Sequence, residues 1–550
     1  MALLVAAVPV RASEPPAGRV VVLLKRPVAR ASIAVAAAAL TADGAVRDGP
    51  LVPAIGLVTL RRRPGVPLAT LLRRLRAGPG VASAEPERRY RLRAPASRLP
   101  DDPALTAAET WPGTPAGVPM QWWAAREGFP RAWAVTRGRG AIVGVIDTGV
   151  AAGHPDLAGK LAGAIDRDSD PARGPATTDE SGHGTHVASL ACAATGNGIG
   201  IAGAGWGCRL VVVKSDLTDA SVAAGIVDAT DRRAQAINLS FGDDQGARPP
   251  ASLRRAIGYA VARRVVLVAA AADSAVEEQG DPANALQPPG SRGRPSLGLS
   301  VTAAGADGRR APFAGYGDEI SLAAYGAYAP GAPLLASGLP PGPPGLLGAF
   351  PAGPAGAEST ACPPSGCRVT LDGAPYAYLQ GTSMAAPQVA AVAAMARALN
   401  PDLRAGDVIR LLGRTARRPR GHGWEPALGW GILDAGAALD SARRIDRRPP
   451  LVRLIAPAIS ARRAFTLRWT AGDPAPAGVR ASGVDRFEVR VARNRGRPRM
   501  AARTRRRWLR FRGAPGARYR FSVVAVDRAG NRGTAAPRAR AVVTVAAGAR

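Results

Sequence analysis

The chain has 550 residues, and at roughly 100 to 200 residues per domain this length predicts three or four units. Its 47% hydrophobic and 21% charged residues exclude a wholly disordered protein, and 65 Gly with 50 Pro indicate many long loops. The net charge of +32 is concentrated in residues 441–550, where 28 Arg stand against 5 acidic residues and leave +9 for the rest. Only three of the 73 basic residues are Lys, and an Arg bias of this kind follows from a GC-rich genome without any nucleic-acid partner.

Residues 1–13 read as a truncated signal-peptide remnant. Ala2 to Val10 is a short apolar run, and Ala12 is the small residue expected before a cleavage site, although the usual basic start is missing. No other run approaches the roughly 18 apolar residues that span a bilayer, and the Ala-rich stretch 32–40 is too short. The sequence predicts a secreted protein without a membrane span.

Residues 19–93 predict a small α+β unit. An apolar strand, RVVVLLK, opens it at 19–25, a helical stretch lies near 68–75, and a last strand-like piece leads into AEPERRYRL. The segment 93–103, with its Pro and Asp residues, looks like a domain boundary.

Residues 101–445 predict a doubly wound α/β domain with a mostly parallel sheet. Unbroken apolar strands are expected in this part of the chain, as is usual where both faces of a parallel sheet are covered. Helix-compatible stretches lie between them, and the site is expected at the carboxyl ends of the strands. The strands are at 141–146, 210–213, 236–240 and 265–271, and the helices at 183–194, 219–230 and 251–263.

The last unit, 449–546, predicts a small β-sandwich. Strand-like pieces FTLRWT, RFEVRVA and RYRFSVVAVD alternate with turns, including AGN at 529–531. It follows a domain that contains a Pro- and Gly-rich region with little periodicity at 325–373.

Ser383 lies in GTSMAAP, 381–387, with a small residue two positions before it and another two positions after it. Such spacing lets a strand turn abruptly into a helix and leaves the hydroxyl at a helix N-terminus, where backbone N–H groups favour an anionic intermediate. Taken alone, this pattern also fits an inert helix-capping serine.

His183 and His186 lie in SGHGTHVAS, 181–189, and make up half of the four His in the chain. A His with an ordinary pKa of about 6.5 can act as a general base near neutral pH, and we assign this role to His183 and a structural role to His186. A metal site is disfavoured, because HxxH lacks the Glu and the third ligand of zinc peptidases.

Asp147 closes the apolar strand in VGVIDTGV, 143–150. A buried carboxylate is costly unless it accepts hydrogen bonds, and orienting the Nδ1–H group of a histidine would satisfy it. The alternative is a carboxylate that caps the turn at Thr148 and Gly149.

The three motifs, in the order Asp, His, Ser, resemble those of the subtilisin-like serine proteases over residues 101–445. The resemblance implies a serine endopeptidase in which Asp147 orients His183, His183 takes the proton of Ser383, and Ser383 attacks the scissile carbonyl to give an acyl-enzyme. It also includes HPDL at 154–157 and the lead-in PRAWAVTRGRG.

Further residues follow from the resemblance. INLSFG looks like the family's edge strand, which implies that Ser240, Phe241 and Gly242 hold the substrate backbone as an added β-strand. Asp156 and Asn197, in the TGNGIGI loop, look like part of its structural calcium site, with a Gly-rich turn as the alternative.

Two positions depart from the family pattern. Asp273, preceded by Ala272, stands where the family has its oxyanion-hole Asn, and a carboxylate would repel the charge that an amide N–H stabilises. Gln388 replaces the usual His after Pro387. The first departure predicts slower turnover and leaves open a pseudoprotease that binds peptides without cutting them.

The four Cys form two local pairs, Cys192 with Cys208 and Cys362 with Cys367. In an exported protein the short separation of the second pair favours a small disulfide-closed loop, and the spacing argues against zinc.

The flanking units also resemble known modules. Residues 19–93 resemble the inhibitory propeptides of these proteases, with autocleavage expected between Arg93 and Asp101, and residues 449–546 resemble a fibronectin type III or immunoglobulin-like module. The implied partners are polypeptide substrates, the chain's own propeptide and an anionic cell-wall or surface polymer at the basic C-terminal unit. Nucleic acid is not expected as a partner, and surface adhesion through 449–550 is the remaining alternative.

Overall fold

The computed structural model describes residues 19–25, 30–41, 44–87, 99–242, 249–294, 296–361, 366–418 and 423–550. The chain divides into two compact units, residues 1–96 and 97–550.

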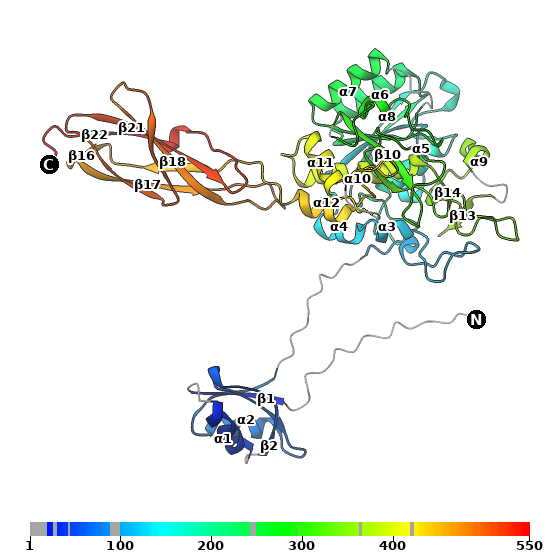
Figure 1. The fold of residues 1–550 in the computed structure, drawn as a ribbon. Coiled ribbons are helices and arrows are strands. Elements are labelled where there is room, and N and C mark those ends of the chain that lie inside the picture. Colours follow the sequence, from blue (N-terminus) through cyan, green and yellow to red (C-terminus); the bar gives the residue numbers. More distant parts are fainter. Residues whose placement is uncertain are drawn as a thin grey trace. The chain divides into compact units, whose positions relative to one another are not determined.

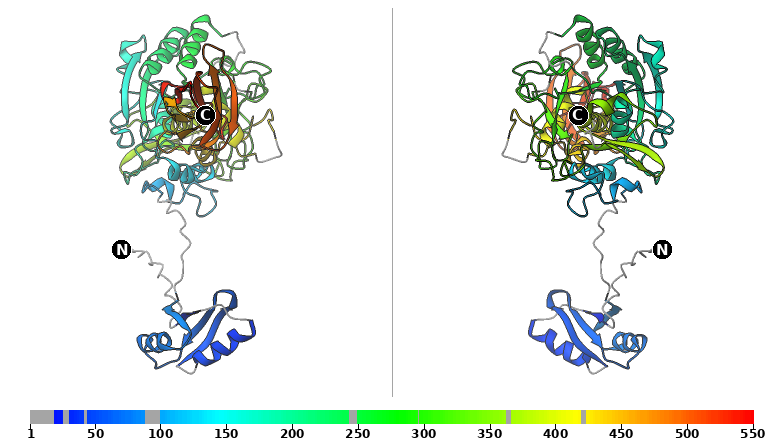
Figure 2. Two further views of the ribbon diagram at one scale, coloured as in Figure 1. Left: turned by 90° about the vertical axis from the view of Figure 1, so that its left-hand side faces the viewer. Right: turned by 90° about the vertical axis from the view of Figure 1, so that its right-hand side faces the viewer.

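The first unit is a four-stranded antiparallel sheet of order β2-β3-β1-β4 with two helices, in the chain order βαββαβ of ferredoxin-like modules. Figure 2 shows α1 and α2 beside the sheet, and their apolar side chains share one core with it. Its elements are β1 (Arg19–Leu24), α1 (Arg30–Thr41), β2 (Ala45–Val52), β3 (Leu57–Arg62), α2 (Leu68–Ala77) and β4 (Val81–Pro86). The α+β prediction is confirmed, and the expected continuation of the last strand past residue 87 lies outside the described residues.

The second unit is built on a seven-stranded parallel sheet of order β11-β10-β9-β8-β5-β7-β6. In Figure 1 its strand β10 lies among the helices of this unit. Its strands are β5 (Ile142–Asp147), β6 (Leu161–Arg167), β7 (Arg209–Ser215), β8 (Ala236–Leu239), β9 (Val266–Ala270), β10 (Gly298–Ala304) and β11 (Leu322–Tyr325). After β5 the chain adds β6 and β7 on one side and β8 to β11 on the other, so the strand order reverses at β5, where α/β sheets bind their ligands.

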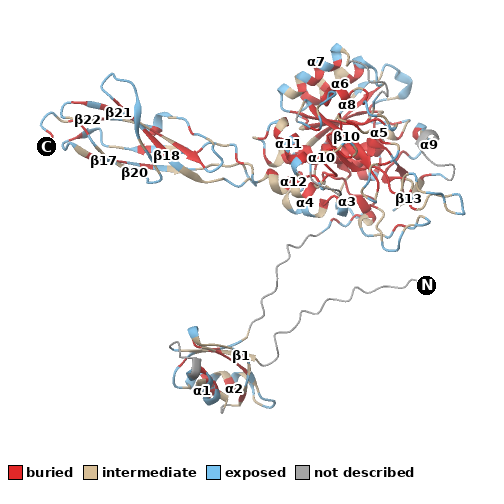
Figure 3. Cartoon of the chain, viewed as in Figure 1, coloured by how far each residue is buried: buried red, intermediate tan, exposed pale blue. Residues whose placement is uncertain are grey.

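Helices cover both faces of this sheet, as predicted for a doubly wound domain. One face packs against α6 and α7, and the other against α5 and α10. Buried residues concentrate in the sheet and in α10 (Figure 3). The helices of the unit are α3 (Trp122–Arg126), α4 (Phe129–Val135), α5 (His183–Cys192), α6 (Asp219–Asp231), α7 (Ala251–Ala262), α8 (Ala283–Leu286), α9 (Gly356–Ala361), α10 (Thr382–Leu399), α11 (Ala405–Thr415) and α12 (Ala435–Ala442).

Two smaller β structures complete the unit. The poorly periodic region contains part of an antiparallel sheet of order β12-β14-β13, made of β12 (Leu346–Ala349), β13 (Arg368–Leu371) and β14 (Ala374–Leu379). The C-terminal part has a three-stranded sheet, β15-β17-β20, and a five-stranded sheet, β16-β22-β21-β18-β19, whose apolar side chains meet in one core. All pairs in these two sheets are antiparallel except β16 with β22. The strands are β15 (Leu451–Ile455), β16 (Ile459–Ser460), β17 (Ala464–Gly472), β18 (Val484–Arg493), β19 (Arg499–Thr504), β20 (Trp508–Arg512), β21 (Arg518–Asp527) and β22 (Arg540–Val545).

The predicted fold class is thus confirmed: a parallel α/β sheet, an N-terminal α+β module and C-terminal antiparallel sheets. Within the described residues, no helix combines the length and the apolar character needed to cross a bilayer.

Candidate active site

Asp147 ends β5 and His183 begins α5, and the structure brings the two side chains together. His183 Nδ1 donates to Asp147 Oδ1 at 2.7 Å, and the same oxygen accepts the Thr148 backbone N–H at 2.8 Å. Asp147 is 1% exposed, whereas the His183 side chain keeps 25% of its surface open to solvent. A buried carboxylate therefore fixes one ring nitrogen, and the ring itself faces the solvent-filled cleft.

Asp179 ties the turn after Asp147 to the start of α5. Its Oδ1 accepts from Thr148 Oγ1 at 2.9 Å and from the Gly182 N–H at 2.9 Å, and its Oδ2 accepts the Thr185 N–H at 2.8 Å. These N–H groups belong to the first turn of α5, which has no partners for them within the helix. The sequence analysis did not single out Asp179. The feature that could have pointed to it is an acidic residue four positions before His183.

Ser383 lies in the first turn of α10, as the GTSMAAP pattern predicted. Gly381 precedes the helix with φ of 152°, a backbone conformation that glycine adopts more readily than other residues. A Cβ atom at this position would also lie only 2.9 Å from Asp273 Oδ2, which is too close for an ordinary contact. Ser383 Oγ donates to the Ser240 carbonyl at 3.0 Å, and Ser240 Oγ donates back to the Ser383 carbonyl at 2.9 Å. The hydroxyl thus points at the end of β8 and shares its cleft with His183.

Asp273 follows β9 and faces the same helix N-terminus. Its Oδ1 accepts the backbone N–H of Thr382 at 2.8 Å, and Thr382 Oγ1 donates to the Ala271 carbonyl at 2.6 Å. The carboxylate is therefore held against the residue that precedes Ser383. Asp273 also lines the cleft, together with Ser383 and His183.

The cleft is a cavity of about 460 Å³ that contains Asp147, His183, Ser383 and Asp273 together. Burial disfavours the charged form of His183, but the charge and hydrogen bond of Asp147, with weaker contributions from Asp179 and Asp273, raise its pKa above the ordinary value of 6.5. The ring is thus poised to accept a proton and to be stabilised as an imidazolium.

Of the three residues predicted to hold the substrate backbone, two line the cleft and one does not. Ser240 and Phe241 line the cavity, whereas Gly242 is exposed and is not among the lining residues. His186 is fully buried, its Nε2 faces the carbonyls of Leu346 and Ala377, and burial lowers its pKa to about 4. Gln388 is also buried and donates to backbone carbonyls within and beside α10.

Asp156 and Asn197 are brought together, as the calcium prediction requires. Asn197 Nδ2 donates to Asp156 Oδ1 at 3.1 Å, and Asp156 Oδ2 accepts the Ile201 N–H and the Tyr376 hydroxyl. Asp102, which sequence reasoning missed, accepts the Gly196 N–H with Oδ2.

The surroundings of Asp102 indicate whether this loop can bind a cation. It is 1% exposed, and its Oδ1 has no hydrogen-bond partner among the described atoms. Burial raises its pKa to about 6, and the charge of Asp156 adds to that rise. Two buried carboxylates that repel each other beside loop carbonyls fit a hard cation such as calcium.

A second acidic cluster follows α12. Carboxylate oxygens of Asp446, Asp473 and Asp527 lie within 4.8 Å of one another. Each also accepts a backbone N–H, from Ser482, Gly483 and Asn531 respectively.

The cysteine prediction is confirmed for one pair: Cys192 and Cys208 form a disulfide with a Cα–Cα distance of 5.6 Å. Cys367 is also disulfide-bonded, and Cys362 lies outside the described residues.

Comparison with known proteins connects this geometry to a family. The sequence model described as "Subtilase family" matches residues 138–431, which is more than half of the chain. Thermitase of Thermoactinomyces vulgaris is 31% identical over 274 residues, covering 48% of this chain and 78% of thermitase. An extracellular protease of Xanthomonas campestris is 30% identical over 414 residues, covering 68% of this chain and 61% of the relative, which is less than two thirds of its length.

Among solved structures, a protease of Pseudoalteromonas arctica matches with a TM-score of 0.47 and 27% identity, covering 59% of this chain and 97% of that one. The family match contains Asp147, His183 and Ser383, and extra regions precede and follow it. The chain belongs to the subtilase family of serine endopeptidases.

Proposed function

We propose that this chain is an exported serine endopeptidase, made as a precursor, that hydrolyses peptide bonds through Asp147, His183 and Ser383. The observation that carries the proposal is the 2.7 Å contact between His183 Nδ1 and Asp147 Oδ1 in one cleft with Ser383. Export is supported by the relatives named extracellular proteases.

In the proposed mechanism His183 Nε2 takes the proton as Ser383 Oγ attacks the scissile carbonyl. The hydroxyl now donates to the Ser240 carbonyl, so a rotation about χ1 must turn it toward the imidazole. His183 then passes the proton to the leaving amine, and water repeats the attack on the acyl-enzyme. Asp147 stabilises the imidazolium that forms in between. The Ser383 backbone N–H, at the start of α10, is the main donor left for the oxyanion.

A pseudoprotease is the second candidate, favoured by Asp273 beside the N-terminus of α10. An organophosphonate separates the two, because it modifies only an activated serine. Stoichiometric labelling of Ser383, absent in the Ser383→Ala variant, supports the peptidase. A correctly folded parent protein that stays unlabelled favours peptide binding without cleavage.

We propose that residues 19–93 are an inhibitory propeptide, because their βαββαβ module precedes a peptidase. Maturation would cut between Arg93 and Asp101, a region of which 93–98 lies outside the described residues. In the Ser383→Ala protein, purified without other proteases, the full-length precursor should persist, whereas the parent should lose about 10 kDa from its N-terminus. Mass spectrometry of both proteins checks this. Asp307, an acid that is 60% exposed beside Arg309 and does not line the cleft, provides the control: Asp307→Asn should mature like the parent. Cleavage of the Ser383→Ala chain at the same place would contradict self-processing.

We propose that Asp156, Asn197 and Asp102 hold a structural calcium ion together with carbonyls of the 195–201 loop. The ion would relieve the repulsion between the two carboxylates and fasten the loop. Removing calcium with EDTA should lower the melting temperature by about 5 °C, the order expected for a ligand present at about 100 times its Kd. Asp102→Asn should shrink this shift, and Asp307→Asn should leave it intact. Identical melting curves with and without calcium would contradict the site.

We propose that the C-terminal sheets bind an anionic cell-wall or surface polymer. On the outer face of the β15-β17-β20 sheet, Arg468 is paired across strands with Trp508, and Arg510 with Thr466. Arg506 lies over the Trp508 ring, 5.2 Å from its centroid. Sedimentation with an acidic polysaccharide, lost when 449–550 are deleted, would support the proposal, and equal sedimentation of both proteins would refute it.

A further inference from the structure

Three acidic residues gather where the segment after α12 meets the C-terminal sheets. Asp446 lies in this segment, Asp473 directly follows β17, and Asp527 ends β21. One carboxylate oxygen of each lies within 4.8 Å of those of the other two. We call these three residues the junction cluster. Because β17 and β21 belong to different sheets, the cluster connects the segment after α12 with both of them.

Among the described residues, the junction cluster has no Lys or Arg as an ion-pair partner, although it lies in the most basic part of the chain. Residues 441–550 contain 28 Arg and only five acidic residues. The two acids outside the cluster, Asp485 and Glu488, are each paired with Arg side chains. The three acids that face one another are therefore the ones that this excess of Arg leaves unpaired.

The arginines that follow Asp446 in the sequence pair with other acids. Arg447 pairs with Asp407 of α11, and Arg448 pairs with Asp402 at 2.7 Å. These two cations thus neutralise carboxylates that precede α12 in the sequence, and they do not compensate the charge of Asp446.

Two members of the cluster are buried and are held by uncharged donors. Asp446 is 5% exposed and accepts the N–H groups of Ser482 at 2.7 Å and Arg448 at 3.0 Å. Asp527 is 1% exposed and accepts the N–H and the side-chain amide of Asn531 at 2.7 and 2.8 Å. Such donors orient the carboxylates without neutralising them, and buried charges without an opposite charge are costly.

Asp473 supplies an oxygen without a hydrogen-bond partner. Its Oδ2 accepts the Gly483 N–H at 2.5 Å, whereas its Oδ1 is closed to solvent and has no hydrogen-bond partner among the described atoms. Burial raises the pKa of Asp473, and the charges of Asp446 and Asp527 add to the rise. The Gly483 N–H and the Ser482 hydroxyl act in the opposite direction without cancelling it. A bound cation would satisfy the buried oxygen and neutralise its neighbours together.

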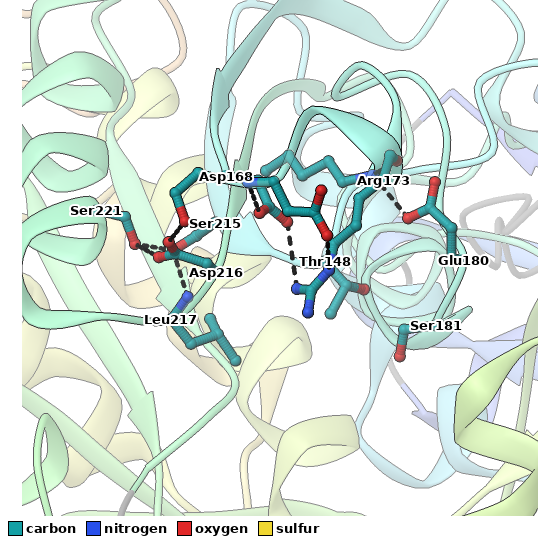
Figure 4. Close-up of polar contacts among 12 residues, drawn as sticks. Thr148, Asp168, Arg173, Glu180, Ser181, Ser215, Asp216, Leu217 and Ser221 are labelled. Carbon is teal, nitrogen blue, oxygen red and sulfur yellow. Dashed lines mark hydrogen bonds and ion pairs between the residues drawn. The ribbon is translucent and has the colours of Figure 1, made fainter.

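A group of acids beside the catalytic cleft shows how such charges are compensated elsewhere in the chain (Figure 4). Glu180 pairs with Lys214 at 2.7 Å, and Asp168 pairs with Arg173 at 3.4 Å. Asp216 accepts hydrogen bonds from three hydroxyl groups. Each of these acids already has a cation or hydroxyl donors, so that group needs no bound ion.

We propose that the junction cluster binds one calcium ion, which fastens the segment after α12 to the C-terminal sheets. Oxygens that bind the same calcium ion at about 2.3–2.6 Å lie at most about 5 Å apart, so the spacing of the cluster fits one ion. Carboxylate oxygens without nitrogen or sulfur ligands favour a hard cation. The site shares no residue with the one proposed at the 195–201 loop, and it does not depend on the proposed peptidase function.

Trypsin probes this junction directly, because it cuts after Arg and the segment around Asp446 offers three such sites. Calcium at about ten times its Kd should lower the population of the open segment, and so the rate of cutting, about tenfold. Extracellular modules bind calcium with Kd values of about 10⁻⁴ to 10⁻³ M, so about 10 mM calcium is compared with EDTA. The sites to be followed by mass spectrometry are Arg443, Arg444 and Arg447.

The digestion uses the full-length Ser383→Ala chain, so that self-digestion does not contribute. The activity of trypsin on a free peptide in each solution provides the reference rate. Cutting at the three sites that proceeds equally fast with calcium and with EDTA would overturn the proposal.

Asp473→Asn, added to this chain, assigns the ion to the cluster. The amide oxygen can keep the Gly483 N–H, and the NH₂ group replaces Oδ1 and can donate to the other carboxylates. We therefore expect slower cutting than in the parent chain in EDTA, because repulsion is reduced, together with loss of the protection by calcium. A purely structural role of Asp473 would instead speed cutting in both solutions and leave the protection in place, and that result would overturn the assignment.

Two control variants separate the junction from the 195–201 loop. Asp102→Asn and Asp307→Asn should both keep the calcium protection at the junction, and its loss in the folded Asp102→Asn protein would place the responsible ion at the loop. If Asp473→Asn does not keep the circular dichroism of the parent, calorimetric titration of calcium into the Asp102→Asn protein decides. One remaining bound ion supports the junction site, and no binding overturns it.

Discussion

Replacing Asp147 with Asn should lower kcat by about 10⁴-fold, the loss seen when the Asp of such a triad becomes an amide. In the structure Oδ1 accepts both the His183 Nδ1–H and the Thr148 N–H, while Oδ2 is buried without a hydrogen-bond partner among the described atoms. An amide oxygen at the Oδ1 position would leave a buried NH₂ group unsatisfied. The flipped amide would donate to Nδ1 and move the ring proton to Nε2, where it blocks the attack of Ser383.

The pH profile distinguishes this effect from a general loss of structure. Because the charge of Asp147 raises the pKa of His183, its removal should lower that pKa, and the acid limb of kcat/KM should move to lower pH in the residual activity. Stopped assays from pH 4 to 9 on parent, Asp147→Asn and Asp307→Asn proteins measure both quantities. A kcat within tenfold of the parent, in a protein of native circular dichroism, would remove Asp147 from the mechanism.

The motifs along the chain were sufficient to predict that Asp147, His183 and Ser383 share one cleft. Asp147 and Ser383 lie where their motifs place them, because one ends β5 and the other lies in the first turn of α10. Parallel strands place their carboxyl ends at one edge of the sheet, so distant motifs converge without any knowledge of the loops. The strands predicted from continuous apolar runs, β5, β7, β8 and β9, are almost entirely buried.

Three strands of the parallel sheet, β6, β10 and β11, escaped prediction, the first two for opposite reasons. β6 is an edge strand with no buried residue, and the apolar part of its sequence, LAGAI, is short and made largely of Ala and Gly. β10 is wholly buried, but Ser300 and Thr302 interrupt the apolar residues of GLSVTAA, so the sequence shows no continuous apolar run. Thr302 Oγ1 donates to the Gly315 carbonyl, a tertiary contact with no local signal.

Supporting residues of the site were also beyond sequence reasoning. Asp179 lies in the polar run TTDESG, where an acid has no distinguishing feature until the turn after Asp147 folds against it. Asp102 precedes a proline in a presumed linker, and its role depends on the Gly196 N–H, 94 positions away in the sequence. The hydrogen-bond partners of Asp179 and Asp102 come from other parts of the chain, so the local sequence does not reveal them. Ser383, in contrast, can be recognised from the glycine and alanine residues that flank it in the sequence.

Replacing Asp273 with Asn should raise kcat by about 100-fold, because it restores a donor whose removal from an oxyanion hole costs about 10²- to 10³-fold. Oδ1 already accepts the Thr382 N–H, so the amide oxygen takes that position and Nδ2 takes the place of Oδ2 beside Gly381. The new N–H group would then stabilise the charge that the present carboxylate repels.

Asp273→Ala separates the two parts of this effect, because it removes the repulsion without adding a donor. We expect the order Asn above Ala above Asp in kcat, with KM changing less, since the oxyanion forms only in the transition state. Both variants should also move the acid limb to lower pH, because the charge of Asp273 contributes to the raised pKa of His183. If Asn and Ala raise kcat equally, repulsion alone limits the parent enzyme and the amide adds nothing. If Asn lowers kcat, the Asp273 carboxylate takes part in catalysis, most simply as a protonated donor to the oxyanion.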